Sequence, residues 1–214
     1  SLISVTLQTE EPMRRLLTTA AAMLTLAGCA DAGTPVEPRT VPDGPGATKY
    51  YYPPQWIFPP LVPEITLDAS PGWEVGTRFT TTREGRISSF RFWKAVGETG
   101  SHTVRLWTAS GQFLHSASPV VETASGWQSA SSPVSVVLPP GTYIVSVNTN
   151  TKQVKTFGYF TNYGPIYRNY LTADAGAYGQ PTGSMPSTIS GSAFFVDVKF
   201  YPLRCDTDYD SPCP

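Results

Sequence analysis

The stretch that decides the fold is RISSFRFWKAVGETGSHTVRLWTASGQFLHSASPVVETASGWQ, residues 86–128. Within it, short runs that alternate apolar and polar residues are separated by turns rich in glycine. A strand places successive side chains on opposite faces, so this alternation is typical of antiparallel strands with one buried face. The stretch also holds three of the five tryptophans and both histidines of the chain. We therefore take it as the centre of the folded domain.

The same pattern continues on both sides, and no segment has a helical period. It predicts strands over residues 73–80, 87–93, 103–108, 112–117, 127–138, 142–148 and 193–201, with shorter ones near 157–160 and 170–173. Many short strands with glycine and proline between them favour an all-β fold, an antiparallel β-sandwich of the jelly-roll kind. We expect the sandwich over residues 64–202, behind a disordered proline-rich N-terminal region.

Composition narrows the function classes. Only 14% of the 214 residues are charged, and the formal net charge is −1. Such a chain has no positive field to attract phosphate groups, which argues against nucleic acid as a partner. We expect no cofactor and a monomer.

The N-terminal residues resemble a bacterial lipoprotein signal. Met13-Arg14-Arg15 is a short basic segment, and the apolar run Leu16 to Leu26 is too short to span a bilayer. The run ends in Leu26-Ala27-Gly28-Cys29, which resembles a lipobox. The resemblance implies that Cys29 is lipidated after cleavage between Gly28 and Cys29. Met13 is expected to be the true start, because Glu10 and Glu11 stand where a signal would have basic residues. The protein would then be anchored to membrane lipid in the bacterial cell envelope, facing the periplasm or the cell exterior.

A proline-rich linker is predicted over residues 29–63, with nine prolines between Ala30 and Pro63. Near its end lies an aromatic island, YYYPPQWIFPP (Tyr50 to Pro60). Exposed Trp56, Ile57 and Phe58 would be unfavourable in water. Either the island folds back over the domain, or it is a ligand for an aromatic groove of another protein.

Strand alternation separates a core face from a candidate binding face in the central stretch. The core side chains are predicted to be Phe90, Phe92, Val104 and Leu106. On the opposite face of one hairpin, with residues 94–102 as its loop, would lie Arg91, Trp93, Arg105 and Trp107. Tryptophan beside arginine suits a sugar, which stacks on a ring and accepts hydrogen bonds. Alternatively, the island or the irregular region 164–186 covers these tryptophans.

The two histidines differ in their setting. His115 lies inside a predicted strand, which indicates a structural residue. His102 follows Gly100-Ser101 in a turn, which is a better place for function, so it joins the ligand-binding candidates.

No catalytic constellation is evident. The chain has no Gly-x-Ser-x-Gly elbow and no His and acidic cluster with metal-ligand spacing. Glu122 and Asp197 are the candidates for cleaving a glycosidic bond, and no spacing brings them together. Asp197 is expected instead to pair with Lys199 or Arg91 across a sheet face. We therefore predict no catalytic residues and no metal site.

The C-terminal tail, residues 203–214, contains Cys205 and Cys213, which we expect to form a disulfide in an oxidising compartment. Asp206, Asp208 and Asp210 alternate as in part of a calcium loop. The turn glycine and distal glutamate of such a loop are missing, so a solvated acidic tail is the preferred interpretation.

Several pieces of the domain together resemble the bacterial domain of unknown function 4082 family. They are RFWK (91–94), TGSHTVRLW (99–107), SGQFL (110–114), ETASGWQ (122–128), PV (133–134), GTY (141–143) and FVDVKF (195–200). The resemblance implies an extracellular β-sandwich module and no established activity. Residues 147–155 depart from the family pattern, so a ligand site there would not carry over.

Three hypotheses follow. The first is a membrane-anchored lipoprotein that displays a non-catalytic binding module, with a glycan or envelope polysaccharide as ligand. The second is a structural or adhesion module that binds a protein partner through the aromatic island. The third, a glycan-active hydrolase, has the least support and would depend on His102 or Glu122.

Overall fold

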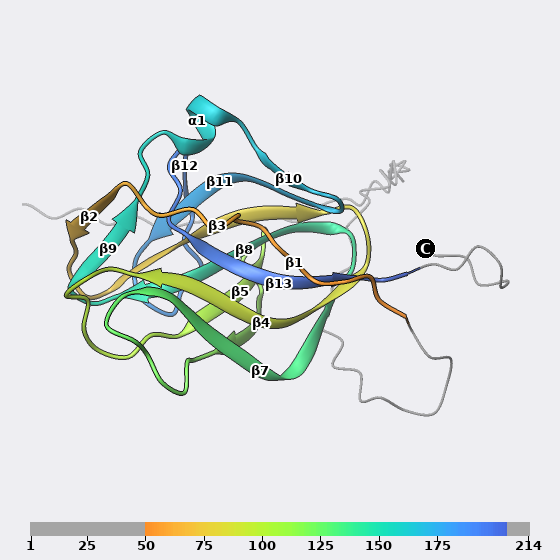
Figure 1. Ribbon diagram of the computed structural model, residues 1–214, viewed down its shortest axis with the longest axis horizontal. Helices are drawn as coiled ribbons and strands as arrows, with labels where there is room; N and C mark the ends of the chain where they lie inside the picture. Colours follow the sequence, from red (N-terminus) through yellow and green to blue (C-terminus); the bar gives the residue numbers. More distant parts are fainter. Residues whose placement is uncertain (1–49, 205–214) are drawn as a thin grey trace, which may run out of the picture. The chain divides into compact units, whose positions relative to one another are not determined.

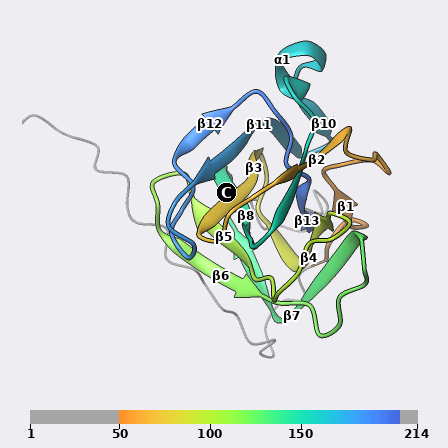
Figure 2. The same ribbon diagram turned by 90° about the vertical axis from the view of Figure 1, so that its left-hand side faces the viewer.

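The alternating segments pair antiparallel in two stacked layers, as seen in the computed structural model, which describes residues 50–204 (Figure 1). The four-stranded sheet has the order β1 (Gln55–Trp56), β13 (Val196–Pro202), β4 (Gly85–Lys94) and β7 (Gly126–Leu138). The seven-stranded sheet runs β10 (Ile166–Arg168), β11 (Leu171–Gly179), β3 (Trp73–Thr81), β8 (Gly141–Thr149), β5 (Val104–Thr108) and β6 (Phe113–Ala117), and β12 (Thr188–Ser190) pairs with β11. The predicted β-sandwich is confirmed, and Figure 2 shows its two layers from the end.

Two further elements lie outside these sheets. The strands β2 (Ile65–Asp68) and β9 (Lys152–Lys155) form a small sheet of their own. A short helix, α1 (Tyr159–Tyr163), stands where the sequence predicts a strand near residues 157–160. Gly158 and Gly164, with φ of 59° and 74°, flank the helix. These left-handed glycines interrupt an extended chain, so the prediction of a strand there was wrong.

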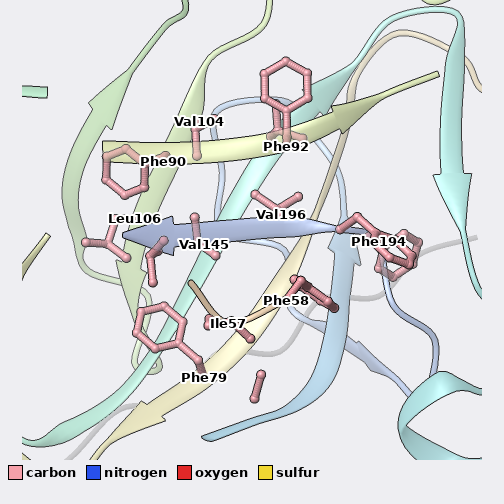
Figure 3. Packing of buried hydrophobic residues seen from close by; sticks show 14 of the residues in the cluster. Ile57, Phe58, Phe79, Phe90, Phe92, Val104, Leu106, Val145, Phe194 and Val196 are labelled. Atoms are coloured by element: carbon pink, nitrogen blue, oxygen red, sulfur yellow. The ribbon is translucent and has the colours of Figure 1, made fainter. Parts of the chain in front are cut away.

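The core lies between the layers and draws on both of them. Phe90 and Phe92 of β4 meet Val104 and Leu106 of β5, and all four are at most 2% exposed (Figure 3). The predicted core residues are therefore confirmed. Alternation also holds in β13, where Val196, Val198 and Phe200 are fully buried.

The predicted hairpin between residues 87–93 and 103–108 does not exist. β4 pairs with β13 and β7, whereas β5 pairs with β6 and β8 in the other sheet. Residues 95–103 therefore cross between the layers. Alternation tells which side chains share a face of one strand, but it does not tell which strand lies beside it.

The aromatic island folds back onto the sandwich. We call residues Tyr50–Leu61 the strap. Its β1 pairs with β13, beside which it lies in Figure 1. Ile57 and Phe58 are 0% and 2% exposed. This confirms the prediction that the island covers a patch of the domain.

The remaining differences concern short elements. The predicted strand near residues 170–173 continues to Gly179 as β11. The predicted strand from residue 193 begins only at Val196, because Phe195 has a φ of 55°. Strands of two to four residues, such as β1, β2 and β10, are too short to show an alternating pattern in the sequence.

Candidate functional site

The outer face of the four-stranded sheet carries Arg91, one of the predicted ligand-binding residues. Its guanidinium lies between two indole rings, 4.3 Å from the centroid of Trp56 and 4.1 Å from that of Trp127. It donates to Asp197 Oδ2 from Nε at 3.0 Å and from NH2 at 2.7 Å. This confirms the expected pairing of Asp197 with Arg91.

The strap completes the bonding of this ion pair. The backbone amides of Ile57 and Phe58 donate to Asp197 Oδ1 and Oδ2 at 2.8 and 3.1 Å, and Phe58 O accepts from Arg91 NH2 at 2.7 Å. Burial raises the pKa of Asp197 to about 6, although Arg91 and both amides favour its charged form. Arg91 therefore has Nε and Nη2 engaged within the chain.

Trp93 lies on the same outer face and is half-buried. Its ring packs edge-on against Trp127, with centroids 5.6 Å apart. Trp127 also contacts Phe58 and Phe195 at centroid distances of 6.4 Å. The strap thus covers the Arg91 side of this outer face, and Trp93 lies beside it against Trp127.

Arg105 and Trp107 lie on the outer face of the other sheet, so the predicted face of four residues is divided between the two sides of the sandwich. Arg105 forms an ion pair with Glu74 of β3, which also accepts from the Gly183 amide at 3.0 Å. Burial raises the pKa of Glu74 against the influence of these donors. Glu74 Oε2 is buried and accepts no hydrogen bond of ordinary geometry. The Ser146 hydroxyl nevertheless lies near enough to this carboxylate to lower the pKa of Glu74.

Trp107 is only 5% exposed. Its indole Nε1 donates to Ser146 Oγ at 3.0 Å, and its ring packs with Ile144, Ala177 and Met185. Met185 belongs to the irregular region that the sequence offered as an alternative cover. Trp107 is therefore covered by the loop around Met185, whereas Trp93 packs against Trp127, which the strap contacts through Phe58.

His102 is buried rather than exposed in a turn. Its Nδ1 lies 2.8 Å from Glu122 Oε2, and its Nε2 lies 2.9 Å from Glu98 Oε1. Lys94 Nζ donates to Glu122 Oε2 at 2.9 Å. Burial opposes ionisation of Glu122, but Lys94 and His102 outweigh it and lower its pKa. Both ring nitrogens of His102 face carboxylates of the same chain.

Glu98 holds the turn between β8 and β9. It accepts from the amides of Asn150 at 2.8 Å and Thr151 at 2.9 Å, from the Lys152 amide, and from the Thr151 hydroxyl at 2.8 Å. Burial opposes its ionisation, but the bonds from His102, Asn150 and Thr151 lower its pKa. The buried charge cluster of Lys94, Glu98, His102 and Glu122 therefore connects three loops.

A cavity of about 20 Å³ adjoins this cluster, lined by Val75, Phe92, Glu98, His102 and Asn148 among others. It has room for about one water molecule, whereas small-molecule sites usually measure about 300–1,000 Å³. The geometry around His102 is that of a structural junction.

The remaining candidates, Glu122, Asp197 and His115, belong to different groups of contacts. Glu122 belongs to the charge cluster, while Asp197 belongs to the Arg91 ion pair, so the structure does not bring the two acids together as a glycosidase pair. His115 bonds to Ser132 Oγ at 2.7 Å and stacks on Phe90, with centroids 6.2 Å apart. Burial lowers the pKa of His115. These contacts give His115 the structural role expected of it.

Aromatic side chains that do face water are frequent along the segment of α1 and β10. Tyr163, Tyr167 and Phe157 are 71%, 68% and 55% exposed, and half-buried Tyr159 lies against Tyr163 with ring centroids 5.4 Å apart. We call residues 157–167 the aromatic ridge. The alternation of apolar and polar residues does not reveal the ridge, because the segment has no strand period. The high local density of aromatic residues (FGYFTNYGPIY) is nevertheless visible in the sequence.

Among residues 50–204, no group of three His, Cys, Asp or Glu side chains is placed to hold a metal ion. No helix in that range is long and apolar enough to cross a membrane. Cys29, Cys205 and Cys213, and hence the predicted lipidation and disulfide, lie outside the described residues.

Comparison with known proteins identifies the family. Searches among curated proteins and among solved structures found no match. A family model described as Domain of unknown function (DUF4082) matches residues 61–196, which is more than half of the chain. The matched range includes β4 and β7, the charge cluster and the aromatic ridge, and it ends at Val196, the first residue of β13. The chain therefore belongs to the Domain of unknown function (DUF4082) family.

Proposed function

We propose that this protein displays a non-catalytic β-sandwich binding module on a bacterial envelope, and that its ligand is carbohydrate bound at the aromatic ridge. The observation that carries the proposal is the exposure of Phe157, Tyr163 and Tyr167 on one short segment. Exposed aromatic side chains that gather in one place commonly mark an interaction site. This contact surface differs from the one predicted from the sequence. The predicted residues, Arg91, Trp93, His102, Arg105 and Trp107, make their contacts within the chain.

The chemistry of the ridge suits a sugar. An aromatic ring offers a flat apolar face against which the C–H groups of a pyranose can stack, and a tyrosine hydroxyl adds a hydrogen-bonding group. The ridge is mounted on the edge of the seven-stranded sheet, because β10 pairs with β11 directly after α1. A firm support of this kind reduces the entropy lost on binding.

A binding role is also supported by the state of the residues that a hydrolase would use. His102 and Glu122 are held together with Lys94 and Glu98, and Asp197 is engaged with Arg91 and the strap. Location outside the cytoplasm is supported by the lipobox-like Leu26-Ala27-Gly28-Cys29 of the sequence. A membrane anchor followed by a proline-rich linker would hold the module away from the lipid surface.

The test is glycan binding by the full chain and by Tyr163→Ala/Tyr167→Ala. We expect retention on at least one polysaccharide in an array and in affinity electrophoresis. The double variant should bind at least about tenfold more weakly, since losing an aromatic–sugar contact costs on the order of 1 kcal/mol each.

Phe113→Ala is the matched control, because Phe113 is also exposed but lies on β6, at the opposite edge of the same sheet. This control should bind like the unaltered chain. Unchanged binding by the tyrosine variant would reject the ridge as the site. Failure of the unaltered chain to bind any polysaccharide would reject carbohydrate as the ligand.

A further inference from the structure

The strap is bound to the sandwich in the way that a separate peptide would be. It runs antiparallel to β13, with Gln55 opposite Phe200. The Tyr52 amide donates to Pro202 O at 2.8 Å, and the Arg204 amide donates to Tyr50 O at 2.8 Å. Without the strap, β13 would be an edge strand of the four-stranded sheet, because β4 is its other neighbour. Addition of a strand to such an edge is a common mode of peptide recognition.

The face beside β13 binds both the backbone and the side chains of the strap. Asp197 accepts two consecutive strap amides, from Ile57 and Phe58, and Arg91 donates to the Phe58 carbonyl. Phe58 stacks on Phe195 with centroids 5.1 Å apart, and Ile57 is fully buried. We call this face, formed by Arg91, Trp127, Phe195 and Asp197, the strap groove.

The connection between strap and sandwich is short and exposed. It consists of residues 62–64, and Val62 within it is 69% exposed. The family match begins at residue 61, so nearly the whole strap lies outside it. None of the contacts in the strap groove depends on this connection.

We propose that the strap groove is a docking site for the strap of a second copy of this chain, so that two copies can exchange straps. The contacts made in exchange are the same as those made within one chain, and the two arrangements differ only in the path of residues 62–64. The closed arrangement is then favoured in dilute solution by its high effective concentration, and exchange is favoured where copies are crowded together. This gives the sandwich a partner independent of its glycan binding.

The test uses two variants of the full chain that cannot close on themselves. The first, Ile57→Asp/Phe58→Asp, has a defective strap and an intact strap groove. The second, Arg91→Met/Asp197→Leu, has an intact strap and a defective groove. Removing both partners of the buried ion pair leaves no unpaired charge, so the second variant is expected to fold.

Each variant alone should sediment as a single chain. Mixed in equal amounts at about 100 µM, they should form a complex of twice that mass containing one copy of each. Each variant without the other is the matched control. If the mixture contains single chains only, while circular dichroism shows that both variants are folded, the proposal is overturned.

A synthetic peptide with the sequence of residues 50–61 provides a second measurement. It should bind the strap-defective variant and not the groove-defective one. Peptide binding without complex formation would reject the second copy as the occupant, and absence of both would reject the groove itself. If the double replacement in the strap unfolds the chain, the milder Phe58→Ala takes its place in both experiments.

Discussion

Arg91 combines three kinds of contact that a lysine could not reproduce. Its planar guanidinium is stacked between Trp56 and Trp127, donates twice to Asp197, and donates once to the Phe58 carbonyl. These partners come from the strap, which includes β1, and from β7 and β13, so one side chain joins three segments to β4. Lysine carries a point charge without the flat, forked group that this arrangement requires.

We therefore expect Arg91→Lys to lower the free energy of unfolding by about 2 kcal/mol, the usual value of hydrogen bonds to a charged group. The measurement is the urea midpoint at unchanged m-value. Arg78→Lys is the matched control, because Arg78 also bonds twice to one carboxylate, Asp174, but the pair is about one third exposed. The control should lose roughly 0.5 kcal/mol or less. Equal losses in the two variants would contradict the role assigned to stacking and burial.

At the scale of elements, the crossing between the two sheets depends on Glu98. Residues 95–103 leave β4 in one layer and enter β5 in the other. Glu98 on this crossing holds the turn after β8 through three backbone amides, and His102 attaches the loop that carries Glu122. A carboxylate can accept several hydrogen bonds at once, whereas a protonated or amidated side chain accepts fewer.

The lowered pKa of Glu98 predicts a pH dependence. Because the folded-state pKa lies below the unfolded value, Glu98 contributes its full stability above about pH 4.5, and this contribution is lost as the pH falls through the folded-state pKa. Glu98→Gln should be less stable than the unaltered chain at pH 7 by about 2 kcal/mol. The difference should narrow towards pH 3, as followed by urea unfolding at each pH.

Asp68→Asn provides the comparison, since Asp68 also has a lowered pKa from its bond with Lys152 but is fully exposed. Its replacement should leave stability nearly unchanged at every pH. A constant difference between Glu98→Gln and the unaltered chain from pH 7 to pH 3 would show that ionisation of Glu98 is not what holds the turn.

At the scale of the whole molecule, the sandwich, the strap and the segments before them suggest a display arrangement. The described part of the chain supplies a rigid module whose exposed aromatic ridge lies at one sheet edge, and the sequence before it is rich in proline and contains Cys29. The proposed lipid anchor would keep many copies on one surface, which is also the condition that favours exchange of straps.

The anchor is tested by Cys29→Ser. Expressed from Met13 in a bacterial host, the unaltered chain should be found in the membrane fraction, and Cys29→Ser should lose that association because no thiol remains to accept the lipid. Cys205→Ser, which removes a cysteine outside the lipobox-like sequence, is the matched control and should remain with the membrane. Membrane association of Cys29→Ser equal to that of the control would refute the anchor.

The all-β class, most strand positions and the core could be predicted from the sequence. Alternation placed Phe90 and Phe92 on the inner face of β4 and placed Arg91 on the outer face, where it meets Asp197 as expected. These features depend on the geometry of a single strand, in which neighbouring side chains point in opposite directions. That geometry is local, so a pattern of a few residues is enough to reveal it.

The candidate site could not be predicted in the same way. Whether Arg91 and Arg105 share a face depends on which strands pair, and the tertiary structure places β4 and β5 in different sheets. Whether the tryptophans are free depends on the strap and on the loop around Met185, which reach them from distant parts of the chain. The sequence by itself determined which side of each strand is apolar. Only the tertiary structure decided which polar faces remain open to a ligand, because long-range packing controls what covers them.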